Sequence, residues 1–249
     1  MNGTIRLARA ELRKLFTTKA FPVSFAIAIV LAIGSVLIDA MVAGRNGAAR
    51  LGTDANVYQM LKFGAITCVV MLILGILAAG SEFRHRTIIP ALLATPCRSR
   101  VFAVKVAVVA VLGAAVSAVV FGLGLATIVL TLSAHAIHHL PAGTGTLYVG
   151  SVISSACFGM IGVALGTLTR NTVGAIIASV AWALFIEQVI LRATAPGIEK
   201  WLPTNAAIGL TNAPGPGSLS PAVAGVVLTG YAIGLLALAS RTTIRRDIA

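Results

Sequence analysis

Residues 81–105 read SEFRHRTIIPALLATPCRSRVFAVK and contain five Arg or Lys residues and two prolines. They separate two apolar runs, residues 63–80 and 106–133, neither of which contains a charged residue. An α-helix needs about 20 mostly apolar residues to cross the hydrocarbon core of a bilayer. The pattern therefore predicts two membrane-spanning helices joined by a basic connection that lies outside the bilayer.

The composition of the whole chain also indicates a membrane protein. Of its 249 residues, 58% are hydrophobic and 10% are charged, whereas soluble domains carry about 25% charged residues. The mean hydropathy is +0.98. Of the three cysteines, Cys68 and Cys157 lie within apolar runs, which is typical neither of a disulfide framework nor of a metal cluster.

Six apolar runs are long enough to cross a bilayer, and we predict an all-α membrane protein in which residues 1–249 form one transmembrane domain. The first run is longer than the apolar part of a signal peptide, and no clear cleavage site follows it. We therefore expect that run to be retained as a span. The predicted spans are residues 20–41, 63–80, 106–133, 147–169, 172–191 and 221–240.

The distribution of basic residues predicts the orientation of these spans. With six spans both termini lie on one side, and that side carries 14 of the 19 Lys and Arg residues. Because cytoplasmic loops are enriched in Lys and Arg, we expect both termini in the cytoplasm. This distribution accounts for the formal net charge of +12 without a nucleic-acid partner.

The first 19 residues are basic and amphipathic. On a helical wheel one face carries Ile5, Ala8, Leu12, Leu15 and Phe16, while basic residues lie off that face or at its border. The spacing favours a helix that lies in the inner membrane surface, with its cations near anionic headgroups. The alternative is a basic flank that only sets the orientation of the first span.

The connection at residues 82–105 combines its cations with an apolar patch outside the predicted membrane. Pro90 can begin a short helix there, and Pro96 disfavours helix at the residue before it. An apolar patch rimmed by cations favours a docking surface, and the alternative is a solvated loop. The patch consists of Ile88, Ile89, Leu92 and Leu93.

Residues 81–105 resemble the signature of the ABC-2 type transporter permeases, the membrane subunits of ABC exporters. Members commonly show an E-[FY]-R-x-x-T-[IL] run and then a T-P run that ends in lysine. The resemblance extends to the six-span layout, the basic amino-terminal stretch and the turn GTLTRNTVGA at residues 166–175. His85, Arg86 and Cys97 depart from the common pattern. The matching residues are Glu82, Phe83, Arg84, Thr87, Ile88, Thr95, Pro96, Arg98 or Arg100, and Lys105.

This resemblance implies the permease of an ATP-driven exporter in a bacterial plasma membrane. Residues 82–105 would carry a coupling helix that docks on a separate ATPase, and residues 1–19 would form an elbow helix. Two ATPase subunits would bind ATP and Mg, and a second permease copy or a close relative would complete the pathway. Relatives move drugs, lipids, glycans and peptides, and the apolar interior suits amphipathic cargo. The implied coupling residues are Glu82, Phe83, Arg84, Arg86, Thr87, Ile88, Ile89, Leu92 and Leu93.

The chain lacks the sequence motifs of several catalytic sites. None of its five lysines follows a glycine, so it has no P-loop, and HExxH and GxSxG motifs are also absent. We therefore expect no enzymatic activity and no cofactor in the chain itself. His135, His138 and His139 lie close together, but without further nearby ligands we expect them to be solvated rather than to bind a metal.

The second class of function left open is an ATP-independent membrane protein, such as a channel, a secondary carrier or an assembly factor. An ATPase with a P-loop in the neighbouring reading frame would favour the exporter.

Glu187 and Trp201 are candidate pathway or gate residues, and the alternative for Glu187 is a residue that marks the bilayer edge. Residues 192–220 are either an outer loop or, as the resemblance implies, partly re-entrant. The pairs Gly162/Gly166 and Gly230/Gly234 permit close helix approach.

Overall fold

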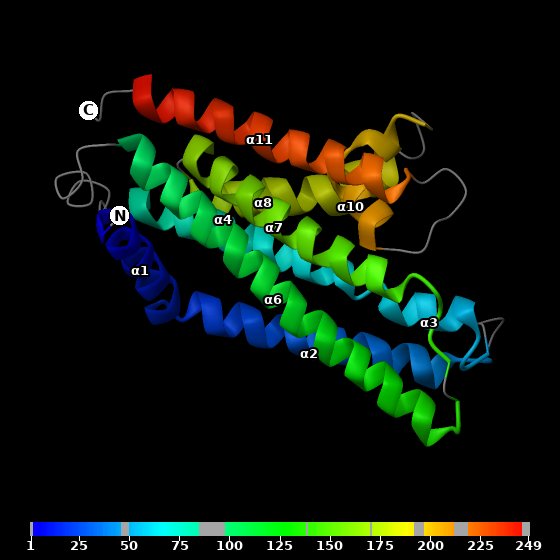
Figure 1. Ribbon diagram of the computed structural model, residues 1–249. Coiled ribbons are helices and arrows are strands. Elements are labelled where there is room, and N and C mark those ends of the chain that lie inside the picture. Colours follow the sequence, from blue (N-terminus) through cyan, green and yellow to red (C-terminus); the bar gives the residue numbers. More distant parts are fainter. Residues whose placement is uncertain are drawn as a thin grey trace.

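Helices make up the fold throughout the part of the chain that the structure describes. The computed structural model describes residues 2–45, 50–84, 98–137, 139–169, 171–191, 197–211 and 219–245, and no strand occurs within these ranges. In chain order the elements are α1 (Asn2–Thr17), α2 (Ala20–Val42), α3 (Asp54–Leu61), α4 (Gly64–Arg84), α6 (Arg98–Ala134), α7 (Thr144–Thr169), α8 (Thr172–Ala181), the π-helix η1 (Trp182–Leu191), the 3-10 helix η2 (Glu199–Trp201), α10 (Pro203–Thr211) and α11 (Pro221–Arg245) (Figure 1).

Five helical segments in the described ranges are long and apolar enough to cross a membrane: α2, the run from α3 through α4, α6, α7 and α11. Each contains a predicted span. At about 1.5 Å per residue, the 23 residues of α2 extend over roughly 35 Å, which exceeds the approximately 30 Å of a bilayer core. These segments give the chain the all-α fold of a multi-pass membrane protein.

The predicted span at residues 172–191 is helical but has a different geometry. The side chain of Asn171 accepts a hydrogen bond from the N–H of Gly174 at 3.1 Å, and this cap begins α8. After ten residues the α-helix changes into the π-helix η1, which ends at Leu191. The apolar part of this run, residues 172–187, is shorter than the five long segments.

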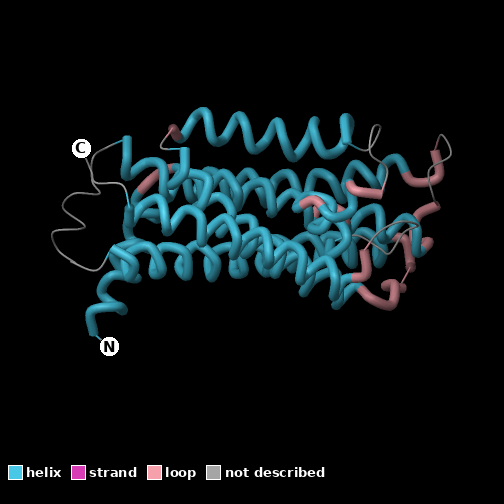
Figure 2. Tube along the Cα trace, turned by 90° about the horizontal axis from the view of Figure 1, so that it is seen from above, coloured by secondary structure: helices cyan, strands magenta, loops and turns pink. Residues whose placement is uncertain are grey.

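The long helices lie side by side and alternate in direction, so that α1 and the carboxyl end of α11 are at the same end of the bundle (Figure 1). Most of the described loops gather at the opposite end (Figure 2). Helix α7 lies at the centre of this arrangement, because it contacts α4, α6, α8, α10 and α11. Its buried residues occur along its whole length.

Glycines bring α4 and α7 into backbone contact. A methyl group added at Gly75 would overlap the carbonyl oxygen of Gly159, and one added at Gly162 would overlap that of Leu72. Close backbone approach of this kind is what small residues permit in membrane helices. The predicted pair Gly162/Gly166 thus packs within the chain. In contrast, no described atom lies within 4 Å of a methyl group added at Gly230 or Gly234.

Buried hydroxyl groups also join the central helices. Thr67 of α4 and Ser155 of α7 are hydrogen-bonded at 2.7 Å, and Ser117 of α6 and Ser151 of α7 at 2.9 Å. Such bonds satisfy polar groups that would otherwise be costly in an apolar bundle, and each contributes roughly 0.6 kcal/mol in membrane proteins. They fix α7 relative to α4 and α6, and so hold one wall of the site described next.

Candidate functional site

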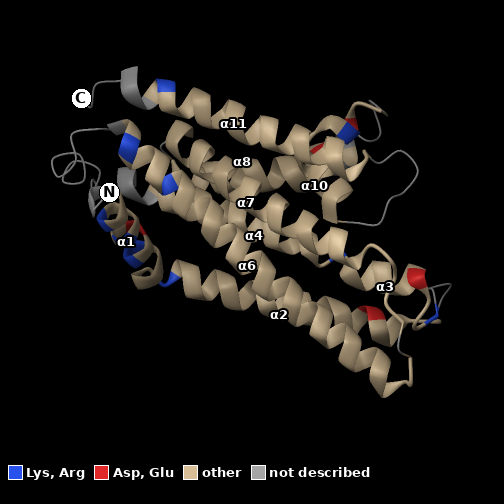
Figure 3. Ribbon diagram, in the orientation of Figure 1, with Lys and Arg blue, Asp and Glu red and all other residues tan. Residues whose placement is uncertain are grey.

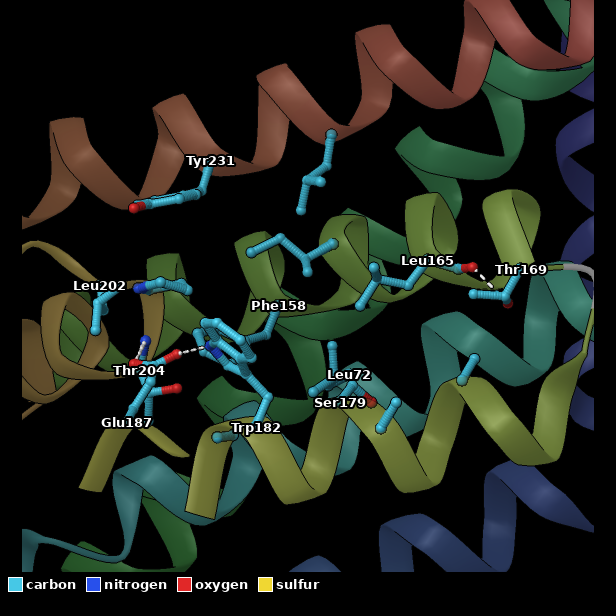
Figure 4. A pocket seen from close by; sticks show the side chains of 16 residues that line it. Leu72, Phe158, Leu165, Thr169, Ser179, Trp182, Glu187, Leu202, Thr204 and Tyr231 are labelled. Carbon is cyan, nitrogen blue, oxygen red and sulfur yellow. Dashed lines mark hydrogen bonds between the residues drawn. The ribbon is translucent and has the colours of Figure 1, made fainter. Parts of the chain in front are cut away.

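A cavity of about 450 Å³ lies between α7, the α8–η1 run, α10 and α11 (Figure 4). Its walls are mostly aliphatic. Phe158, Ile161 and Leu165 line it from α7, and Tyr231 lines it from α11. The one acidic residue in the lining is Glu187 of η1, whose exposed fraction is 0%. We call this space the Glu187 cavity.

Hydrogen bonds hold the Glu187 carboxylate in a fixed position. The indole N–H of Trp182 donates to Oε1 at 2.7 Å, and the backbone N–H of Thr204 donates to Oε2 at 3.0 Å. The backbone of Asn205 also hydrogen-bonds to this carboxylate. These donors belong to two segments, η1 and α10, so Glu187 joins the α8–η1 run to α10.

The π-helix explains why Trp182 and Glu187 meet. Residues five apart lie about 140° apart around an α-helix, because each residue turns the helix by about 100°. A π-helix instead closes its hydrogen bonds between residues five apart, which places those residues one above the other. Single π-helical turns are frequent at functional sites. The local change of helix geometry therefore builds the polar end of the cavity.

Glu187 also caps α10. That helix begins at Pro203, and proline is favoured at a first helical position because its missing N–H leaves nothing unsatisfied. The N–H groups of Thr204 and Asn205 belong to the first turn, where no intrahelical acceptor exists. A carboxylate at this position satisfies these groups and lies at the positive end of the helix dipole. The cap anchors α10 beside the cavity.

The described lining of the Glu187 cavity contains no cation. Of the sixteen described residues that line it, none is Lys, Arg or His. Within the described part of the chain, no ion pair involves Glu187. Arg192, the basic residue five positions after Glu187, lies outside the described residues. An ionised Glu187 thus places one negative charge in an otherwise apolar space.

The two predicted gate residues are not brought together. Trp201 lies in η2, its exposed fraction is 47%, and it does not line the Glu187 cavity. Glu187 instead contacts Trp182 and Thr204, and Tyr231 lines the same cavity; the sequence pattern did not reveal these residues. Trp182 precedes Glu187 by five residues, and this spacing brings two side chains together in a π-helix but not in an α-helix. The composition of the sequence does not predict a π-helix, so the spacing alone was no signal.

Three of the nine predicted coupling residues are described, and they lie at the other end of the bundle. Glu82, Phe83 and Arg84 form the end of α4, while Arg86, Thr87, Ile88, Ile89, Leu92 and Leu93 lie outside the described residues. Helix α6 begins at Arg98, so residues 98–105 of the predicted connection are helical. Lys and Arg residues of α1, the start of α6 and the end of α11 gather at this end (Figure 3). We call it the basic end.

A buried ion pair ties α1 to the helices that flank residues 85–97. The Nζ atom of Lys105 in α6 lies 3.1 Å from Glu11 Oε2 and donates to the carbonyl of Ala78 in α4 at 3.2 Å. Lys14 also contacts Glu11, at 2.7 Å. Burial alone raises the pKa of Glu11, but the positive charges of Lys105 and Lys14 outweigh it, and the pKa is lowered overall.

Helix α1 confirms that the first residues of the chain are helical, and its predicted apolar face is only partly covered. Leu12 and Leu15 are half-buried, whereas Ile5 and Phe16 are 51% and 56% exposed. Glu11, an acid on the covered side, is buried through its pair with Lys105. The exposed apolar side chains remain available to a membrane surface, as an interfacial helix requires.

The histidine cluster is solvent-exposed where it can be described. His139 contacts Asp54 at 2.6 Å, with both side chains more than half exposed, and His138 lies outside the described residues. No group of three or more His, Cys, Asp or Glu side chains in the described ranges could hold a metal ion. The Glu187 cavity and the basic end are therefore the two regions with organised chemistry.

None of the protein-family models with which the chain was compared matches it, and none of the curated proteins matches its sequence. The function must be inferred from the residues and geometry of the chain itself.

Proposed function

We propose that this chain is the permease subunit of an ATP-driven exporter of the ABC-2 type. The observation that carries the proposal is where α4 ends and α6 begins, which is at the basic end, where α1 also lies. Residues 85–97 connect these two helices in the sequence. Their sequence resembles the coupling segment of that family, and a partner that docks there would contact three helices at once.

The proposal includes six membrane passes. The α8–η1 run would provide the sixth, in addition to the five long segments, because it leads from the end of α7 toward α10 (Figure 1). An even number of passes agrees with α1 and the end of α11 lying at one end. The excess of Lys and Arg at that end would place it in the cytoplasm, with the chain in a bacterial plasma membrane.

The partners follow from what the chain lacks. Two separate ATPase subunits would bind ATP and Mg, because the chain has no P-loop. A second permease copy, or a close relative, would complete the pathway. Residues 192–220 would be partly re-entrant, which is supported by the burial of Ala206, Ala207 and Leu210 in α10. Non-helical backbone at membrane depth requires such shelter by protein.

The ion pair Glu11–Lys105 suggests how movement of a docked ATPase would reach the membrane helices. It connects α1 to α6, and the bond from Lys105 to Ala78 connects α6 to α4. A displacement of residues 85–97 would move both flanking helices and α1 as a unit. Helix α4 in turn packs on α7, which forms a wall of the Glu187 cavity. The path from the basic end to the cavity is thus continuous.

The test is co-purification of the ATPase encoded beside this chain. Leu92→Asp should abolish its association while leaving membrane insertion intact, because buried apolar anchors carry much of an interface's energy and their loss can cost about 2 kcal/mol or more. Leu140→Asp is the matched control, since Leu140 is 39% exposed at the opposite end. Full ATPase binding by an inserted Leu92→Asp variant would contradict the proposal.

An ATP-independent carrier is the second candidate, and the Glu187 carboxylate is the observation that favours it. Acids within membrane segments commonly serve ion-coupled carriers. The two candidates differ in one respect that can be measured directly: an exporter subunit transports nothing without its ATPase. Transport by the purified chain alone in proteoliposomes would favour the carrier.

A further inference from the structure

We propose that the Glu187 cavity binds an organic monocation with an apolar body, such as a quaternary ammonium compound, with Glu187 as its counter-charge. The inference deepens the proposed function, because it names the class of compound that the exporter would move. It can be tested on the chain alone, and it would hold equally for a carrier.

The charge of the cavity carries the first step of the argument. Glu187 is fully buried, and its hydrogen-bond donors, the indole of Trp182 and the backbone of α10, are all neutral. Neutral donors fix the carboxylate without cancelling its charge. Among the described residues that line the cavity, none is a cation that balances it. An acid inside a membrane segment is costly and is a candidate functional residue by default, and a bound cation would supply the missing positive charge.

The type of cation follows from the donors already present. A carboxylate offers about four acceptor positions, and four groups address them: the indole N–H of Trp182, the hydroxyl and backbone N–H of Thr204, and the backbone N–H of Asn205. Few positions remain for a ligand that must donate several hydrogen bonds. A quaternary ammonium group donates none, and is attracted by the charge itself. The site therefore suits a cation whose surface is apolar.

Aromatic rings provide the second feature that such a cation uses. Trp182 of η1 and Phe158 of α7 line the cavity, and Tyr231 of α11 lies across it from Trp182 and Glu187 (Figure 4). The faces of aromatic rings attract cations, and quaternary ammonium groups are commonly held in aromatic cages. Three helices thus contribute rings to the polar end of one cavity.

The remainder of the cavity suits the apolar body. Leu72 and Leu165 lie away from Glu187 in Figure 4, and Ile161 and Leu235 also line the cavity. Its volume of about 450 Å³ lies within the roughly 300–1,000 Å³ of pockets that hold small molecules. An anion would be repelled by Glu187, and a neutral hydrocarbon would use the aliphatic wall only. Preference for a cation over a neutral molecule of the same shape is the property that distinguishes this site.

The experiment compares benzyltrimethylammonium with neopentylbenzene, its uncharged carbon isostere, on the purified chain in nanodiscs. Trp201→Phe leaves Trp182 as the single tryptophan, because the sequence has two, so emission reports on the cavity. Saturation-transfer NMR of each ligand gives a second readout, corrected for partition into protein-free nanodiscs. We expect the cation to bind at least tenfold more tightly, which corresponds to about 1.4 kcal/mol.

Glu187→Gln tests the charge itself. Its amide oxygen can still accept from the first turn of α10, but its NH2 group cannot accept from the indole N–H of Trp182. Some loss of stability is therefore expected, and a cooperative unfolding transition would verify that the variant is folded. We expect the affinity for the cation to fall at least tenfold and that for the isostere to change less than twofold. As a second pair, Tyr231→Leu should weaken cation binding about three- to tenfold, and Tyr231→Phe should not.

Equal binding of cation and isostere, no binding of either, or unchanged cation affinity in a folded Glu187→Gln variant would each overturn the inference. Any of these results, with ATPase association intact, would leave the proposed function standing. Loss of ATPase association with cation binding intact would contradict the proposed function and leave the cation-binding inference standing.

Discussion

Removal of the Lys105 ammonium tests the link between α1 and the two helices that flank residues 85–97. Lys105→Met keeps an unbranched side chain of similar length but removes the charge. The interactions lost include the ion pair to Glu11 at 3.1 Å and the hydrogen bond to the carbonyl of Ala78 at 3.2 Å. The side chains of Glu11 and Lys105 are only 8% and 7% exposed, so water cannot replace these partners easily.

The magnitude depends on what Glu11 retains. Breaking a buried ion pair by removing one partner typically costs about 3–5 kcal/mol, because a charge is left buried and uncompensated. Here Lys14 still contacts Glu11 at 2.7 Å, but its side chain is 45% exposed and screened by solvent. We therefore expect Lys105→Met to lower the free energy of unfolding by about 2–3 kcal/mol. The double variant Glu11→Gln/Lys105→Met should be more stable than the sum of the single variants predicts, by about 1 kcal/mol or more.

The assay is reversible unfolding of the purified chain in mixed micelles, with all four members of the double-mutant cycle. The pH dependence provides an independent check. Because the pKa of Glu11 is lowered in the folded state from its reference value of 4.5, its contribution to stability is complete above about pH 4.5 and is lost as the pH falls below it. The wild-type chain should lose this contribution to its free energy of unfolding at acidic pH, and the Glu11→Gln variant should not. Additive single-variant effects, together with parallel pH profiles, would refute the reasoning.

Three further predictions concern packing, the cavity and topology. Gly162→Ala should destabilise the chain by about 1–3 kcal/mol, because the methyl group would overlap the backbone of α4. The control variant Gly230→Ala should change thermal stability by less than about 0.5 kcal/mol. Equal effects of the two substitutions would contradict the packing of α4 on α7. Trp182→Phe should cost about 1–3 kcal/mol by removing a donor from a buried carboxylate. Trp201→Phe, at a similarly exposed position that does not line the Glu187 cavity, should be nearly neutral in the same thermal unfolding experiment. After replacement of Cys68, Cys97 and Cys157, a cysteine at Gly143 should react with an impermeant reagent in intact cells and one at Arg98 should not; labelling at both positions would exclude the proposed orientation.

Hydrophobic length predicted the positions of the helices well. The predicted span 20–41 is α2 at Ala20–Val42, and the predicted span 147–169 lies within α7 at Thr144–Thr169. Such runs are determined by local composition, because each must be apolar over the thickness of a bilayer. Helix ends were less predictable. Helix α6 begins at Arg98, eight residues before the predicted span, since charged residues can continue a helix beyond the apolar core.

The candidate sites depended on contacts that local patterns do not encode. Lys105 was predicted as part of the connection, whereas it is buried in α6 and pairs with Glu11, 94 residues away in sequence. Glu187 was a candidate from its position in an apolar run, but its partners come from a π-helical turn and from a helix 17 residues further on. Both arrangements are consequences of tertiary packing, so an isolated charge in the sequence indicates importance without indicating its partner.

The central claim, that residues 82–105 couple this chain to an ATPase, is tested most directly by ATP hydrolysis in the complex purified through this chain. The measurement compares wild type, Leu92→Asp and Leu140→Asp at equal membrane abundance. Wild type and Leu140→Asp should retain the ATPase and hydrolyse ATP, and Leu92→Asp should lose both. Equal ATP hydrolysis in the Leu92→Asp complex, or a wild-type chain that purifies without any ATPase, would contradict the account.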